Sequence, residues 1–574
     1  MVEFGLPIIT ITEETVLESY DVIVVGSGGA GLATAVIAAH EGLKVLVAEK
    51  GDNFGGTTAL SGGGIWVPLS SAAIKAGFRD NREVVRSYVQ KVVGDSLELA
   101  QLDAFLDAAP KMVDYFDART AVKFALQPGF PDWAMDVEGA VEDGRLLSPV
   151  EYDGRELGEY FPRLKTPLSE FNAPGGFMVG INDMPHLDNV TKSFKSFCYM
   201  AKLLGRFAID RLRYPRGTRL TMGNALAARL LRSALDAGVT LWDKSPVVEL
   251  LRDGERISGV VLERNGEQVE VLARRGVMLA SGGFSANPQM RAQFIPFAEH
   301  HVSLVPDTNT GDGINMAKAA GAEMEWKNVS NGAWTVMSLA TDSDGKVIKF
   351  PHIFLDRSKP GCIAVNKDGQ RFTDEATLDM VKDMHASGSV PAHLVCDHKF
   401  IKKYGLGLVK PGGLGLKKWI NAGYIITAPT LAELAQKIGC NAANLEDSAA
   451  RMTRYAAEGH DPDFGKGGNA SDRSMGDPHH KPNPCLGPVS SAPFYAVQIL
   501  PGDSTTTLGL KVDDHARVLD SSGVPIPGLY AAGLDMNSLW RGAPPANGGN
   551  NTLSLTFGYL AAMNMVSRTP LNDA

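Results

Sequence analysis

A short apolar strand followed by a glycine-rich turn, close to the N-terminus, is the feature that most constrains this fold. Residues 21–25 (DVIVV) form an apolar run that ends at a glycine, which is typical of a parallel strand buried on both faces. Gly26, Gly28 and Gly31 follow with the spacing G-x-G-x-x-G. They allow a tight turn, close approach of a pyrophosphate and packing of the next helix on the strand. Glu49 ends the next strand, 18 residues after Gly31, and the whole pattern predicts a dinucleotide-binding βαβ unit.

The chemistry of this turn narrows the choice of dinucleotide. The helix that begins near Ala30 directs its N-terminal amides at the phosphates, where the helix dipole favours negative charge. Ser27 lies within the turn, and Glu49 and Lys50 lie at the end of the second strand. An acid at position 49 binds a ribose hydroxyl and disfavours a 2′-phosphate, so we expect FAD or NAD rather than NADP.

The segment that follows Glu49 favours FAD. Residues 51–66, GDNFGGTTALSGGGIW, resemble the flavoprotein group that includes fumarate reductase flavoprotein subunits and the 3-ketosteroid dehydrogenases. In that group the segment wraps the pyrophosphate and passes beside the isoalloxazine ring, where glycine lets the backbone lie against a flat ring. Trp66 either stacks near the flavin or fills the core. The resemblance implies cofactor contacts from Gly56, Thr57, Thr58, Ser61, Gly62 and Gly63.

Further motifs carry the resemblance along the chain. They are ASGGF (280–284), the N-T-G-D-G turn within 306–322, the R-F-x-x-E pattern within 361–377, PGLYAAGLD (527–535) and the helix 548–562. In the family, the small sheet around Val247 meets the adenine, the final acid of PGLYAAGLD meets the ribityl chain, and the N-terminus of the last helix points at the pyrimidine edge of the flavin. The N-T-G-D-G turn opens the family's substrate domain, and the R-F-x-x-E pattern forms a hairpin over the active site. The resemblance therefore adds Val247, Gly282, Asp535, Asn551 and Leu553 as expected cofactor contacts.

The order of these motifs predicts an α/β protein with a discontinuous Rossmann-type FAD-binding domain and an inserted α+β substrate or capping domain. We expect residues 1–303 and 485–574 to form the cofactor domain, with 120–215 as a possible insertion. Residues 304–484 are expected to form the substrate domain. Residues 459–489, rich in glycine and proline, read as a loop that returns the chain to the cofactor domain, beginning with PFYAVQI (493–499).

Composition excludes several classes of protein. The net charge of −9, without a Lys/Arg-rich run, argues against a nucleic-acid partner. Five scattered cysteines without C-x-x-C indicate neither a disulfide framework nor a zinc site, and fit a cytoplasmic protein. The histidine pairs 300–301 and 479–480 lack partners at metal-ligand spacing, so we expect no metal. Residues 1–21 lack a leader pattern and no run approaches ~18 apolar residues, which leaves peripheral membrane contact open.

The resemblance also bears on how the cofactor is held and reoxidised. Family members that attach FAD covalently place a histidine in the glycine loop, and residues 51–65 contain none, so we expect non-covalent FAD. A second G-x-G-x-x-G is absent, so no separate Rossmann site for a nicotinamide is expected. The electron acceptor is then a small molecule, a quinone or another redox protein.

The two best-known branches of the family differ just before the last helix. Fumarate-type reductases carry H-G-x-N-R-L-G-G-N there, whereas this chain has LWRGAPPANGGNN (539–551). The histidine is absent and Arg541 is out of register with the substrate-clamping arginine, which disfavours a dicarboxylate substrate. Steroid Δ1-dehydrogenases carry Y-P-G-A-G, whose tyrosine falls on Pro544 and whose last glycine falls on Gly548. Their other two catalytic tyrosines fall near Asp379 and near Trp133 or Ala134.

The chain therefore resembles the steroid branch without its three tyrosines, and other groups must replace them. The Gly548 N–H and the amides of Asn547 and Asn550 are candidates for holding a carbonyl oxygen. Asp379 is either a general base whose pocket raises its pKa or a solvated carboxylate. Tyr199 supplies a phenol above the ring or packs in the core, and Arg541 pairs with a substrate oxygen or caps a loop.

The expected function is an FAD-dependent dehydrogenase that introduces a C=C bond next to the ketone of an apolar, cyclic substrate, steroid-like or smaller. A base removes the α-proton while the β-hydride passes to flavin N5. Two alternatives remain open. One is an ene-reductase that runs the same chemistry in reverse, and the other is a non-catalytic flavin-binding or electron-transfer protein.

Overall fold

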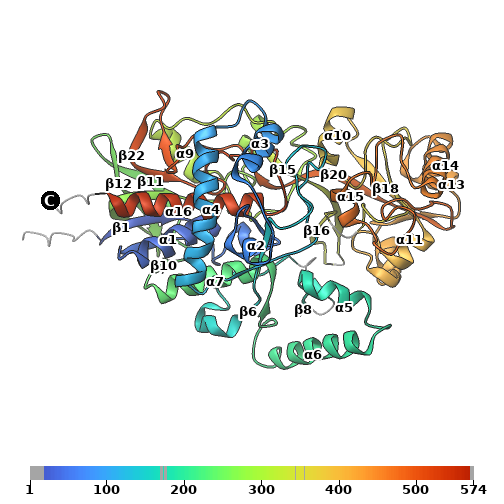
Figure 1. Ribbon diagram of the computed structural model, residues 1–574, viewed down its shortest axis with the longest axis horizontal. Helices are drawn as coiled ribbons and strands as arrows, with labels where there is room; N and C mark the ends of the chain where they lie inside the picture. The colour runs from blue at the N-terminus through green and yellow to red at the C-terminus, as the bar shows by residue number, and fades with distance from the viewer. Residues whose placement is uncertain (1–17, 169–171, 174–176, 343, 354–355, 569–574) are drawn as a thin grey trace, which may run out of the picture.

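The computed structural model describes residues 18–568, apart from 169–171, 174–176, 343 and 354–355 (Figure 1). The expected absence of a leader falls on residues 1–17, which lie outside the described part. Two lobes sit side by side, each built around its own sheet, with the N- and C-terminal helices together in one of them (Figure 1). This arrangement confirms the expected α/β class with a discontinuous Rossmann-type FAD-binding domain and an inserted second domain.

The first sheet contains the predicted βαβ unit. Its main path runs β10 (Thr240–Trp242), β2 (Val45–Ala48), β1 (Glu18–Val25), β13 (Glu267–Leu279), β12 (Arg256–Arg264) and β11 (Val247–Asp253). Strand β1 pairs in parallel with both β2 and β13, which explains why DVIVV is apolar on both faces. The chain re-enters this sheet late, through β21 (Arg517–Leu519) and β22 (Pro525–Ala531), and β22 pairs in parallel with β13.

Helices α1 (Gly29–His40) and α16 (Gly549–Ser567) pack against strands of this sheet, and α7 (Met222–Asp236) packs against α1. A Cβ at Gly31 would lie 2.0 Å from the Gly26 carbonyl oxygen, and one at Gly558 would lie 2.9 Å from the Ala30 oxygen. Because only glycine fits at these two points, α1 packs directly on the turn and on α16.

The second sheet is mostly antiparallel. Its main path runs β16 (Val347–Pro351), β15 (Gly332–Thr341), β20 (Phe494–Thr506), β18 (Ala392–Asp397) and β17 (Cys362–Val365), while β14 (Val302–Ser303) and β19 (Ile426–Ala428) also pair with β20. The helices of this lobe are α10 (Met380–Ser387), α11 (His398–Lys403), α12 (Leu416–Asn421), α13 (Leu431–Ile438), α14 (Ala442–Glu458) and α15 (Ala470–Met475). Residues 493–499, expected to begin the return to the cofactor domain, instead start β20 in this sheet. The domain boundary at 484/485 stays a prediction.

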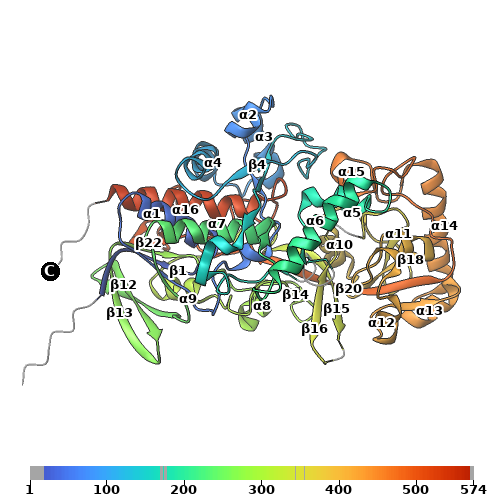
Figure 2. The same cartoon turned by 90° about the horizontal axis from the view of Figure 1, so that it is seen from below.

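The region 120–215 is attached to the first lobe by its own pairings. Strand β5 (Leu146–Pro149) pairs with β3 (Ile65–Trp66) and β4 (Phe124–Leu126), and β6 (Tyr152–Asp153) pairs with β9 (Arg219–Leu220). Backbone hydrogen bonds also join Phe54 to Arg163 and Lys165, at 2.8 and 2.9 Å. The short strands β7 (Asn172–Ala173) and β8 (Phe177–Met178) lead into α5 (Met184–Asp188) and α6 (Phe194–Asp210), which lie along the underside of the molecule (Figures 1 and 2).

The remaining helices complete the two lobes. Helices α2 (Ser71–Lys75), α3 (Arg82–Val93) and α4 (Leu99–Arg119) lie on the first lobe, and α8 (Pro288–Phe294) and α9 (Asp312–Ala319) follow β13 in the chain. Helix α4 packs against α16. Helix α16 is therefore packed between α1 and α4, and its N-terminus lies at the site described next.

Candidate active site

A cleft opens where β1, β2 and β13 end, the position at which open α/β sheets bind their ligands. Most of its wall is backbone of the predicted glycine turn and of the segments after β2 and β13. The lining residues are 25–30, 48–53, 56–58, 280–282 and 533–534, together with Lys165, Val247, Thr308, Asn309, Asp312 and Ser554.

The turn between β1 and α1 fits a pyrophosphate. A Cβ at Gly28 would meet nothing within 4 Å, so the backbone there faces open space, whereas one at Gly26 would lie 2.4 Å from the Ala280 oxygen. Helix α1 has no side-chain cap at its N-terminus, and Thr58 Oγ1 accepts a hydrogen bond from Gly29 N at 3.0 Å. The open backbone face over Gly28, at the N-terminus of α1, is what a dinucleotide phosphate requires.

Glu49 is held rigidly at the end of β2. Its Oε2 accepts hydrogen bonds from Ser27 N at 3.0 Å and Ser27 Oγ at 2.5 Å, and its Oε1 accepts one from Gly51 N at 2.8 Å. The side chain lines the cleft and keeps acceptor capacity for a ribose hydroxyl. Val247, expected near the adenine, lies in the same wall.

The N-T-G-D-G turn forms part of the cleft wall, which we did not expect from its assignment to the substrate domain. Asn309 Nδ2 donates to Gly282 O at 2.7 Å and to Thr57 Oγ1 at 3.2 Å. Lys50 Nζ donates to Asp312 Oδ2 at 2.8 Å, so the Lys50 charge is neutralised within the wall. The N-T-G-D-G motif itself could have indicated this contact, because it leads directly into α9. Lys165 lies in the region predicted as a possible insertion. We did not predict its place in the cleft wall, because no motif marks it.

Asp535 lies fully buried after β22. Its Oδ1 accepts from Gly283 N at 2.9 Å and from Ser281 Oγ at 3.0 Å, and its Oδ2 accepts from Ser281 N at 2.5 Å. Burial raises the pKa of this carboxyl above its usual range. The A-S-G-G motif therefore supplies the amides that hold Asp535. Its contact with the ribityl chain stays a prediction.

The N-terminus of α16 abuts the second glycine loop. Asn551 Nδ2 donates to Ser61 Oγ at 3.2 Å and to Gly64 O at 3.1 Å, and Ser61 Oγ accepts from Gly63 N at 3.0 Å. A Cβ at Gly548 would lie 2.7 Å from Gly64 O, so only glycine permits this approach. At Gly62 a Cβ would meet nothing within 4 Å, which leaves an open backbone face for a flat ring.

Polar groups without firm partners collect at this helix end. Within the described ranges, the N–H of Gly548, which precedes α16, has no acceptor, and the helix has no side-chain cap. Asn547 is half-buried, and Asn550 Nδ2 makes only a long contact of 3.5 Å with Thr505 Oγ1. The Leu553 side chain, in contrast, is buried in the core, and its contact with the cofactor stays a prediction. The free donors are suited to binding a carbonyl oxygen.

Arg541 anchors a loop, which favours one of the two roles left open for it. Its Nη1 lies 2.8 Å from Glu325 Oε2, and both side chains are buried. Its backbone oxygen accepts hydrogen bonds from Val329 N and Ser330 N. Glu325 neutralises the guanidinium, which favours the loop-anchoring role, while the buried Nε of Arg541 has no hydrogen-bond partner among the described residues.

Tyr199 is held by a buried carboxylate. Its hydroxyl donates to Asp183 Oδ1 at 2.6 Å, and its ring stacks on His186 with the ring centroids 4.2 Å apart. Burial, together with the neighbouring Asp183, raises the pKa of Tyr199 to about 12. Arg219 in turn donates to both oxygens of Asp183. The phenol is thus engaged in this arrangement.

Asp379 lies at the start of α10 and faces solvent. Its side chain is 62% exposed, and its Oδ1 lies 2.8 Å from Lys382 Nζ. The apolar pocket that a raised pKa requires does not surround it. Of the two interpretations left open, the structure favours the solvated carboxylate.

Two tryptophans lie near the same helix end. Trp66 is fully buried, donates from Nε1 to Asp132 Oδ1 at 2.9 Å and stacks on Phe105, so it belongs to the core. Trp133, at the position expected for a family tyrosine, donates its backbone N–H to Pro545 O at 2.9 Å. Its buried Nε1 has no hydrogen-bond partner among the residues described, which leaves an indole donor beside the Pro544–Pro545 turn.

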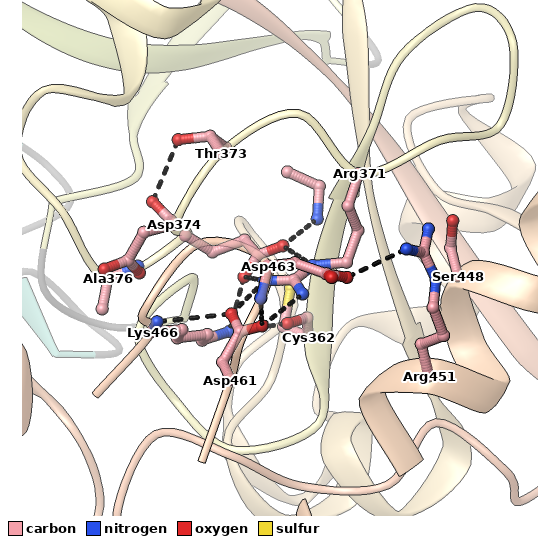
Figure 3. Close-up of polar contacts among 12 residues, drawn as sticks. Cys362, Arg371, Thr373, Asp374, Ala376, Ser448, Arg451, Asp461, Asp463 and Lys466 are labelled. Carbon is pink, nitrogen blue, oxygen red and sulfur yellow. Dashed lines mark hydrogen bonds and ion pairs between the residues drawn. The ribbon is translucent and has the colours of Figure 1, made fainter. Parts of the chain in front are cut away.

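The charged side chains of the R-F-x-x-E motif belong to a buried cluster, and the placement of this motif over the active site stays a prediction. Arg371 donates to both oxygens of Glu375, at 2.9 and 3.0 Å, and to Asp461 Oδ2 at 2.9 Å. Lys466 Nζ lies 3.1 Å from Glu375 Oε2 and donates to Cys362 O at 2.7 Å (Figure 3). Burial alone would raise the pKa of Glu375, but the charges of Arg371 and Lys466 lower it to about 2. We call these four charged residues the Arg371 cluster.

Two kinds of feature are absent from the described ranges. No group of three or more His, Cys, Asp or Glu side chains is arranged to hold a metal ion there. The same ranges contain no helix with the length and apolar character needed to cross a bilayer.

Comparison with known proteins places the chain in a family. The FAD binding domain family model matches residues 21–551. The 4-oxocyclohex-2-ene-1-carboxylate 5-dehydrogenase of Sinomonas cyclohexanicum is 37% identical over 94% of this chain and 92% of its own. The 3-oxosteroid 1-dehydrogenase of Mycobacterium tuberculosis is 33% identical over 96% of this chain and 99% of its own.

A solved structure agrees with these relatives. The 3-ketosteroid Δ1-dehydrogenase of Sterolibacterium denitrificans, in complex with 1,4-androstadiene-3,17-dione, superimposes with a TM-score of 0.89 at 34% identity. The match covers 96% of this chain and all of that one. Together with the cleft geometry, these likenesses show that the chain belongs to the FAD-binding flavoprotein family that includes the 3-ketosteroid dehydrogenases, and that it is an FAD-dependent oxidoreductase.

Proposed function

We propose that this enzyme introduces a C=C bond next to the ketone of an apolar, cyclic substrate, steroid-like or smaller. The observation that carries the proposal is the unpartnered Gly548 N–H at the N-terminus of α16, directly beside the glycine loop 61–64. Relatives with names of this activity, at 37% and 33% identity over nearly the whole chain, support the same class of substrate. FAD, held non-covalently in the cleft, supplies the hydride acceptor when it is bound.

The chain's own residues bind and polarise the ketone. The Gly548 N–H and the amides of Asn547 and Asn550 donate to the carbonyl oxygen, and these donors become stronger as the oxygen gains charge. The positive end of α16 acts in the same direction because its first turn has no side-chain cap. The Trp133 Nε1 is a further unpaired donor at this helix end.

The α-proton needs an acceptor. Of the two residues named from the sequence, we propose Tyr199, with Asp379 as the alternative. Tyr199 takes the proton only as a phenolate, after its own hydroxyl proton has passed to Asp183, and Asp379 only if it leaves Lys382 and water. The exposure of Asp379 to solvent makes it the poorer candidate. A quinone or a redox protein then reoxidises the cofactor, and we propose a cytoplasmic location with contact at the membrane periphery.

Anaerobic stopped-flow absorbance of the FAD-loaded protein tests the proposal. Mixing with 4-androstene-3,17-dione and with cyclohexanone should bleach the flavin with at least one of them. Bleaching by the small ketone alone would assign a single-ring substrate. Reoxidation of chemically reduced protein by cyclohexenone, with no bleaching by either ketone, would contradict the proposal and favour an ene-reductase. Silence in both directions would favour a non-catalytic flavoprotein.

A further inference from the structure

The outward face of α6 carries apolar side chains where a surface helix normally carries polar ones. Phe194 is 82% exposed, and Leu212, just after the helix, is 83% exposed. At about 100° per residue the exposed positions form one continuous stripe. The stripe consists of Phe194, Phe197, Cys198, Ala201, Leu204, Gly205, Ala208, Ile209 and Leu212, all exposed.

The opposite face of α6 is docked by specific contacts, so the helix is not free to roll its apolar stripe inward. Tyr199 is bonded to Asp183, and Asp210 Oδ2 accepts from Thr218 N at 2.9 Å and Thr218 Oγ1 at 2.7 Å. Phe207 packs edge-on against Phe177. Rotation that buried the stripe would break these polar contacts, including those of two buried carboxylates.

The stripe is bordered by positive charge. Residues 192–213 contain six cations and a single acid, Asp210, in a chain whose net charge is −9. That acid is buried and bonded to Thr218. Arg206 is paired with Asp153 at 3.0 Å. The other five cations are exposed: Lys192, Lys195, Lys202, Arg211 and Arg213.

The surroundings of α6 leave this face open. The helix lies along the underside of the molecule in Figure 1 and runs across the front in Figure 2, outside both sheets. The preceding α5, which packs against α6, adds two exposed apolar residues, Met184 and Leu187. We call the stripe, these two residues and the five exposed cations the α6 surface.

We propose that the α6 surface docks on an anionic lipid bilayer, with α6 lying in the plane of the headgroups. An apolar stripe flanked by Lys and Arg is the arrangement with which helices bind such an interface. A second copy of the chain is a poorer occupant, because a two-fold contact would bring the same cations against one another. The membrane-peripheral location and the apolar substrate or quinone of the proposed function agree with this docking. Binding itself requires no turnover, so the two proposals fail separately.

A fluorophore on Cys198 tests the docking directly. Cys198 lies in the stripe and is exposed, Cys440 is partly buried, and the other three cysteines are buried. An environment-sensitive thiol dye is attached to the FAD-loaded full chain carrying C440S. Vesicles of equal parts phosphatidylcholine and phosphatidylglycerol should shift the emission to the blue and co-sediment the protein. High salt should weaken both effects. No shift and no co-sedimentation would overturn the proposal.

Two sets of substitutions separate the stripe from exposed apolar residues in general. The triple variant F194Q/L204Q/I209Q should lower vesicle affinity at least about tenfold while ketone-dependent flavin reduction is unchanged. The matched triple variant L414Q/V347Q/V524Q replaces exposed apolar residues far from α6 in the chain and should bind as the parent does. K195E/K202E should remove the preference for anionic over neutral vesicles.

Analytical ultracentrifugation without lipid tests whether a second copy of the chain covers the α6 surface. A monomer, or an oligomer that F194Q/L204Q/I209Q leaves intact, supports the bilayer as the occupant. Self-association that this triple variant abolishes would overturn the proposal and assign the α6 surface to a second copy. Equal loss of vesicle binding in both triple variants would also overturn it, because binding would then be nonspecific.

Discussion

The cofactor cleft and the Arg371 cluster are both built from motifs that the sequence displays clearly, yet they handle polarity in opposite ways. In the cleft, glycine backbone faces open space at Gly28, and α1 begins without a side-chain cap. Gly62, in the loop beside α16, also has an open backbone face. In the Arg371 cluster, every charge meets its counter-charge in a dry interior. Unsatisfied donors around open space indicate a ligand, whereas a closed set of partners indicates a structural element.

This difference corrects how the family motifs are interpreted. R-F-x-x-E looks chemical because it contains an arginine and a glutamate, but its side chains pair with each other four residues apart. The glycine turn contains no reactive group, and it is the part that we expect to meet the ligand. Four predictions test the contrast, beginning with the largest effect.

Removing the charge of Arg371 should have the greatest effect on stability. Arg371→Met leaves the buried carboxylates of Glu375 and Asp461 without their main counter-charge, which costs about 3–5 kcal/mol. Urea unfolding of the FAD-loaded protein, followed by tryptophan fluorescence, measures the loss. Lys382→Met is the control, since its pair with the 62% exposed Asp379 contributes only ~0–1 kcal/mol. Equal losses in both variants would contradict the contrast.

Alanine at two glycines of the turn should separate ligand binding from folding. A methyl group at Gly28 enters only open space, so Gly28→Ala should fold normally but bind FAD at least tenfold more weakly, ~1.4 kcal/mol. At Gly31 the methyl group would lie 2.0 Å from the Gly26 oxygen, so Gly31→Ala should lower the thermal midpoint of the apoprotein as well. Fluorescence titration with FAD and calorimetry of the apoproteins distinguish the two. A destabilised Gly28→Ala apoprotein would argue against an open cleft.

The pH dependence of stability should expose a carboxyl pair beside the Arg371 cluster. Burial raises the pKa of Asp374 to about 8, and the neighbouring Asp472 carboxylate adds to the effect. The folded state therefore binds more protons than the unfolded state between about pH 4 and pH 8, and this contribution to stability falls as pH rises through that window. Asp472→Asn should flatten the decline, as measured by melting temperatures near both ends of the window. An unchanged slope would exclude the pair as its source.

The smallest effect is expected at Asp379. Because its carboxylate is exposed and paired with Lys382, Asp379→Asn should change the rate of ketone-dependent flavin reduction by no more than about twofold. A general base contributes about 10²–10⁴-fold. Single-turnover stopped-flow measurements distinguish these two sizes of effect. A loss of a hundredfold or more in the rate of flavin reduction would indicate that Asp379 is the general base.

Several parts of the fold could be predicted because their signals are local. The G-x-G-x-x-G turn depends on positive φ at Gly26 and close packing at Gly31, requirements that only glycine meets. Asn551 and the loop 61–64 are far apart in the sequence, but each belongs to a motif that resembles the family. The contribution of Lys165 to the cleft could not be predicted in the same way, since no pattern marks a side chain brought in by a loop–loop pairing with Phe54.

The dinucleotide-binding unit, the preference for FAD and the family follow from the sequence, because these rest on short-range backbone requirements repeated along the chain. Which polar side chains remain available for chemistry depends on the folded arrangement. Folding places Glu325 against Arg541, Asp183 against Tyr199 and Lys382 against Asp379. The first of these pairings joins residues far apart in the chain. Whether a charged or phenolic group is free to act depends on the partners that folding brings to it, and a linear pattern does not record those partners.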